Sequence, residues 1–97
     1  MTMNPDHSIT ATIRVTEAMI RDGIEGDCSA CPVALGIYGA VPTARHAHAG
    51  PNWLSFYLGG LRYTAATPGE LMGIMAEFDG AGTCLPASAE VTFRRAS

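Results

Sequence analysis

The sequence predicts an α+β fold: a mainly antiparallel sheet of four to five strands, with two to three helices packed on one face. Segments near both ends of the chain alternate apolar and polar residues, as half-buried strands do. In the middle, a Gly-Gly dipeptide joins two apolar segments, and a segment with a helical apolar period follows them. With 97 residues the chain forms one domain, residues 1–97, in which we expect residues 1–7 to be flexible.

The first element is a strand, and a short helix follows it. Residues 9–15 alternate Ile, Ala, Ile and Val with Thr and Arg, which predicts a strand with one buried face. Thr16 can then cap a helix over residues 17–22. We expect Gly23 to end this helix in the left-handed conformation, which Gly adopts most easily.

A second helix and an extended segment come next. Pro32 suits the first helical position, because its missing N–H would be unpaired there in any residue. Cys31 is then the N-cap of this helix. Pro42 breaks the chain, and residues 44–48 return to extended character.

A hairpin follows, with a two-residue turn at Gly59-Gly60. This turn pairs Leu58 with Leu61 and fixes the register of the two strands. One face of the hairpin is then apolar: Leu54, Phe56, Leu58, Leu61, Tyr63 and Ala65. The opposite face carries a different set: Trp53, Ser55, Tyr57, Arg62 and Thr64.

The last two elements are a helix and a strand. Residues 67–70 read TPGE, which predicts a capping box with Pro at the first helical position. We expect Gly80 to end this helix. Residues 87–94 alternate small or apolar residues with polar ones, which predicts the final strand.

The polar face of the hairpin is the candidate binding site. Trp, Tyr and Arg are the residue types most enriched among interface hot spots. If the apolar face meets the helices, then Trp53, Ser55, Tyr57, Arg62 and Thr64 form a partner-binding surface. The alternative is that a loop or a partly covered sheet face shelters Trp53.

Cys28 and Cys31 form a CxxC motif at the start of the second helix, and this motif allows two chemical interpretations. A helix N-terminus can stabilise a thiolate, which would suit thiol-redox chemistry, but in thioredoxin-like folds the motif directly follows a strand. The spacing also suits a zinc knuckle, to which His46, His48 or Cys84 could add ligands. We favour a structural role, with Cys31 as a cap and no metal or other cofactor.

Composition and charge narrow the functional classes. A net charge of −3 and Arg residues scattered along the chain disfavour direct binding of nucleic acid. The sequence has no apolar segment long enough to cross a membrane and does not begin with a signal peptide, so we expect a cytoplasmic protein without membrane contact. No catalytic signature is present, which favours a protein that is not an enzyme.

Several segments together resemble a family. RVTEAMIRDGIEGDCSACPVALGI, the hairpin and TPGELMGIMAEFDGAG are similar to small uncharacterised proteins encoded by phages and prophages of actinobacteria. The resemblance covers about residues 13–93, and its distinctive pieces are CPVAL and FDG. It implies no assigned activity and no functional residues. In that pattern the Cys before Pro recurs more dependably than a second Cys, so the resemblance does not favour paired-thiol chemistry.

We therefore expect a small accessory protein of phage or prophage type that acts within the host cytoplasm. It would bind a protein of the host or the phage and so modulate the host or its defence. The alternative function is a zinc-binding or thiol-redox module centred on residues 28–31. Self-association through an exposed strand edge, giving a homodimer, is a third possibility.

Overall fold

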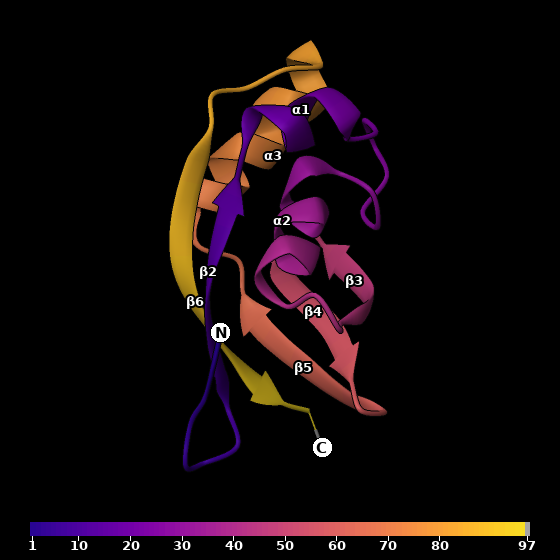
Figure 1. The fold of residues 1–97 in the computed structure, drawn as a ribbon. Helices are drawn as coiled ribbons and strands as arrows, with labels where there is room; N and C mark the ends of the chain where they lie inside the picture. The colour runs from indigo at the N-terminus through magenta and orange to yellow at the C-terminus, as the bar shows by residue number, and fades with distance from the viewer. Residues whose placement is uncertain (97) are drawn as a thin grey trace.

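The structure, a computed structural model, describes residues 1–96, which form six strands and three helices (Figure 1). In chain order the elements are β1 (Thr2–Met3), β2 (Ile9–Val15), α1 (Glu17–Asp22), α2 (Pro32–Ala40), β3 (Arg45–Ala49), β4 (Trp53–Leu58), β5 (Leu61–Ala66), α3 (Gly69–Ala81) and β6 (Ala87–Arg95). The predicted α+β class is confirmed. The predicted four to five strands are too few, because β1 adds a sixth strand at the N-terminus.

The strands form one antiparallel sheet in the order β1-β2-β6-β5-β4-β3. β2 pairs with β6 along its whole length, from Ile9↔Phe93 to Val15↔Ala87. The pairing between β5 and β6 is much shorter and comprises only Tyr63↔Arg95 and Thr64↔Arg94. The two halves of the sheet are therefore joined only near the end of β6.

The core lies between the sheet and the helices. β2 contributes its alternate residues from Ile9 to Val15, and α2 contributes Val33, Ala34 and Ile37, all with at most 2% exposure. Phe56 joins the two halves of the sheet: its ring stacks on Tyr63 of β5 with centroids 5.5 Å apart, and it meets Phe93 of β6 edge-on at 4.8 Å. These three rings bridge β4, β5 and β6 at the point where the ladder between β5 and β6 is short.

The predicted end of α1 is wrong in its conformation. Gly23 follows the helix as predicted, but its φ is −68°, so it is not left-handed. A Cβ atom at this position would lie 2.7 Å from Cδ of Pro32 and 3.0 Å from the carbonyl oxygen of Met19. Gly is required here because the start of α2 packs directly against the end of α1. The Thr16 cap is confirmed, since its Oγ1 accepts from the N–H of Met19 at 3.3 Å.

The predicted capping box of α3 is also wrong. The helix begins at Gly69 with Pro68 as N-cap, and no side chain caps it. The Thr67 hydroxyl instead donates to the carbonyl oxygen of Gly50 at 2.7 Å, which ties the start of α3 to the loop before β4. At the other end the helix continues through Gly80, and Gly82 ends it in the left-handed conformation with φ 73°.

The N-terminal segment forms a hairpin with β2. Thr2 pairs with Thr10 and Met3 with Ile9, and the Asn4 side-chain amide donates to the hydroxyls of Ser8 and Thr10 at 2.9 Å each. The flexibility expected for residues 1–7 stays a prediction. In the structure, this segment is hydrogen-bonded to β2.

Candidate functional site

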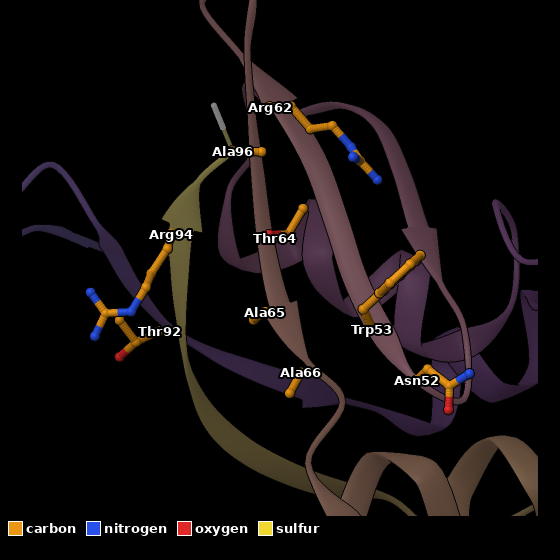
Figure 2. A pocket seen from close by; sticks show the side chains of 9 residues that line it. All are labelled: Asn52, Trp53, Arg62, Thr64, Ala65, Ala66, Thr92, Arg94 and Ala96. Carbon is orange, nitrogen blue, oxygen red and sulfur yellow. The ribbon is translucent and has the colours of Figure 1, made fainter.

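Within residues 1–96, all three helices lie on one face of the sheet, and the other face carries the residues that point away from the core. We call this second face the open face. In Figure 2 helix α2 is seen behind the strands of the hairpin, and the side chains of Trp53 and Arg62 lie on the near side of these strands. The open face is therefore where the sheet presents side chains to solvent.

The hairpin has the predicted register and turn. Gly59 and Gly60 both have positive φ, 58° and 80°, and Leu58 pairs with Leu61. Trp53, Tyr57 and Arg62 lie on the open face, and Tyr57 is directly opposite Arg62. Trp53 is 57% exposed and Tyr57 is 40% exposed, so no loop within residues 1–96 shelters either ring.

Ser55 and Thr64 also lie on the open face, directly opposite each other in β4 and β5. Ser55 is only 5% exposed, however, and Thr64 is half-buried. Ser55 pairs with Thr64 of β5 on one side and with His48 of β3 on the other, so it lies inside the sheet rather than at an edge. Of the five predicted residues, Ser55 is thus the one that a partner can reach least.

A hollow of about 470 Å³ opens on this face beside Trp53 (Figure 2). Residues of β4, β5 and β6, or directly next to these strands, line it: Asn52, Trp53, Arg62, Thr64, Ala65, Ala66, Thr92, Arg94 and Ala96. The sequence-based prediction missed Thr92 and Arg94, because it did not place β6 next to β5. The alternation in residues 87–94 did contain the signal, since it turns both residues away from the core.

The hollow lies where the ladder between β5 and β6 stops. The Ala96 N–H donates to the Arg62 carbonyl oxygen at 2.8 Å, so this pair is hydrogen-bonded. Hydrogen-bonded pairs alternate along an antiparallel ladder, which makes Thr64 and Arg94 the next such pair. Ala66 and Thr92 would be the third, but the ladder does not reach them. Because the alternation continues along each strand, the backbone N–H and C=O groups of Ala66 and Thr92 point into the gap between β5 and β6.

Arg94 contacts the N-terminal hairpin at the rim of the open face. Its guanidinium lies 3.3 Å from a carboxylate oxygen of Asp6, and both side chains are exposed. The Ser8 hydroxyl and the Ser8 N–H donate to the other Asp6 oxygen at 2.6 and 3.1 Å. These hydrogen bonds lower the pKa of Asp6, and the charge of Arg94 acts in the same direction.

The three cysteines do not form a common site. Cys31 is the N-cap of α2, as predicted, and is buried, whereas Cys28 is exposed in the preceding loop. Burial raises the pKa of the Cys31 thiol, which disfavours the thiolate that redox chemistry needs. Cys84 lines a different hollow, next to α1. Burial, with a smaller contribution from the charge of Glu77, raises the pKa of Cys84.

The structure also bears on the zinc alternative. Among the residues that it describes, no three His, Cys, Asp or Glu side chains are grouped so that they could hold a metal ion. Cys28 and Cys31 border a hollow of about 70 Å³ together with Asp27 and Asp79, and neither His46 nor His48 lines it. The histidines predicted as possible ligands belong to β3, where the ring of His46 meets Tyr57 edge-on with centroids 6.0 Å apart.

None of the helices over residues 1–96 is long and apolar enough to span a membrane. Comparison of the chain with protein-family models, with curated proteins and with solved structures finds no match.

Proposed function

We propose that this protein acts by binding another protein through the open face of its sheet. The observation that carries the proposal is the exposure of Trp53, 57%, at the edge of the hollow of about 470 Å³ on that face. A Trp side chain loses more water contact than almost any other side chain when a partner covers it. Tyr57 and Arg62 lie on the same face and supply the other two residue types that dominate interface energetics.

The proposed role is binding rather than catalysis. The face offers aromatic rings, a guanidinium and hydroxyls of Thr residues, which are suited to recognition, and the sequence contains no catalytic signature. The resemblance to phage and prophage proteins suggests a host protein in the bacterial cytoplasm as the partner. The fold would then act as a rigid support for one recognition face.

The test is capture of partners from the lysate of an actinobacterium by the immobilised protein, with mass spectrometry as readout. We expect the wild-type chain to retain a specific protein, and the double variant Trp53→Ala, Arg62→Ala to lose it. Both residues are exposed, so the free energy of unfolding should change by less than about 1 kcal/mol.

A matched control removes similar side chains from the helical side. Met72 of α3 is 42% exposed, and Arg21 of α1 is exposed with an Asp22 carboxylate 3.3 Å away. The double variant Met72→Ala, Arg21→Ala should retain the partner. Capture that survives in the Trp53 and Arg62 variant, or that is lost in the control variant, contradicts the choice of the open face.

A further inference from the structure

The charges of this protein are separated between the two sides of the sheet. Four of the six Arg residues point outward on the open face: Arg14, Arg45, Arg62 and Arg94. Only one of the nine acidic residues, Glu90, points outward there. Seven others lie in α1, α3 or the loop before α2: Glu17, Asp22, Glu25, Asp27, Glu70, Glu77 and Asp79. The ninth, Asp6, contacts Arg94 at the rim.

This separation is not visible in the net charge of −3. The Arg residues are far apart in the sequence, and the sheet brings them to one face because each occupies an outward position in a different strand. Within the described residues, no carboxylate lies within 4.0 Å of the guanidinium groups of Arg14, Arg45 or Arg62. The open face is thus locally cationic on a molecule that is acidic overall.

We propose that the partner presents an extended acidic segment to this face, with an apolar side chain in the hollow beside Trp53. This inference rests on the proposed function and adds the chemistry of the partner. The carboxylates of the segment would meet Arg62 and Arg94, which flank the hollow. The methyl group of Ala66 and the Trp53 ring would contact the apolar side chain.

The backbone of the hollow favours a peptide over a single-stranded nucleic acid. The ladder ends before Ala66 and Thr92, so their peptide groups are positioned to hydrogen-bond with an extended chain. The distance along β5 from Arg62 to Ala66 is about 13 Å, which suits a segment of four to five residues. A nucleic acid would instead need a row of rings for its bases, and the lining of the hollow supplies one aromatic ring, that of Trp53.

The test uses the fluorescence of Trp53, which is the only Trp in the chain. The probes are three eight-residue peptides with a central Phe flanked by Glu, by Ser or by Lys, and an oligothymidylate of eight nucleotides. We expect the Glu peptide to shift the Trp53 emission and to bind about tenfold more tightly than the Ser peptide at low salt. This preference should disappear in 0.5 M NaCl, since the contacts are exposed ion pairs.

The variant Arg62→Gln, Arg94→Gln should lose the preference for the Glu peptide, whereas Arg21→Gln on α1 should keep it. The inference is overturned if the Ser or Lys peptide binds as tightly as the Glu peptide, if the oligothymidylate binds more tightly, or if no probe shifts the emission. If one of these results is obtained but capture from the lysate still depends on Trp53 and Arg62, only the acidic-segment inference fails and the proposed function stands. Loss of that dependence would instead remove the proposed function itself.

Discussion

The hydroxyl of Tyr38 in α2 accepts a hydrogen bond from the backbone N–H of Ala47 in β3, with 2.9 Å between the two atoms. The register between β3 and β4 shifts between Arg45 and His48, and His46 has a positive φ of 53°. Ala47 therefore lies in a bulge and is 1% exposed. Tyr38 satisfies a buried donor within the bulge and links the helical layer to the outer strand of the open face.

We expect Tyr38→Phe to lower the free energy of unfolding by about 1–3 kcal/mol, because the buried N–H of Ala47 loses its partner. Denaturant unfolding gives the loss of stability, and amide hydrogen exchange reports on the bulge. The Ala47 amide should exchange faster in the variant than in the wild-type chain. Unchanged exchange at Ala47 would show that the Tyr38 hydroxyl does not hold the bulge.

The start of α3 provides a second test, because the sequence pattern and the structure assign different roles to the same residues. Thr67→Val keeps the shape of the side chain and removes its hydrogen bond to Gly50, so we expect a loss of about 1–3 kcal/mol. Glu70→Ala should change stability by less than about 0.5 kcal/mol, since Glu70 caps nothing. Urea unfolding of both variants measures the two losses of stability and so distinguishes the bond to Gly50 from a capping box. A capping box would make the Glu70 variant clearly less stable.

Gly23→Ala should destabilise the protein by about 1–3 kcal/mol, because the new methyl group would overlap the ring of Pro32. Gly73→Ala is the matched control: Gly73 lies inside α3, and an added Cβ atom there meets nothing within 4 Å. We expect this control to stabilise the protein by about 0.5–1 kcal/mol. Thermal unfolding compares the two variants. Equal effects would refute the close packing between the end of α1 and Pro32.

The cysteines should differ in reactivity. We expect iodoacetamide to label Cys28 first, since it is exposed, and to reach Cys31 only after unfolding, since Cys31 is buried and its pKa is raised. Cys28→Ser should therefore leave stability almost unchanged. Peptide mapping after timed alkylation gives the order. Rapid labelling of Cys31 in the native protein, or strong destabilisation by Cys28→Ser, would favour the thiol or zinc alternative.

Acid should weaken the fold partly through Asp6 and Asp27. Hydrogen bonds from Ser8 and Ser29 lower the pKa of these two carboxyl groups in the folded protein below their ordinary value of 3.8. Their contribution to stability is thus present above that value and is lost as the pH falls through the lower folded-state pKa. We expect the variant Asp6→Asn, Asp27→Asn to lose less thermal stability between pH 5 and about pH 2 than the wild-type chain. Parallel curves for the two proteins would contradict this assignment.

The elements that depend on local signals could be predicted from the sequence. The bounds of β2, the start of α2 at Pro32 and the register of the Gly59-Gly60 hairpin all agree with the structure. Errors arose where a distant residue determined the local role. Gly23 is needed because of Pro32, and Thr67 bonds to Gly50 rather than to its own helix.

Prediction of the candidate site was also limited to what local signals in the sequence determine. The residues of the hairpin could be assigned to the open face, because one turn determines their register. The hollow also needs Thr92 and Arg94, whose position depends on the pairing of β5 with β6. That pairing joins segments about 30 residues apart, and no alternation pattern within one strand specifies its neighbour. The gathering of four Arg residues on one face could not be predicted for the same reason.

The most direct test of the open face as a binding surface is site-specific photo-crosslinking. Tyr57→p-benzoylphenylalanine places the reactive group on the open face, and Met72→p-benzoylphenylalanine places it on α3 as a control. We expect position 57, and not position 72, to form a crosslink to the captured partner that mass spectrometry identifies. A crosslink from position 72 alone would contradict the central claim and place the interaction on the helical side.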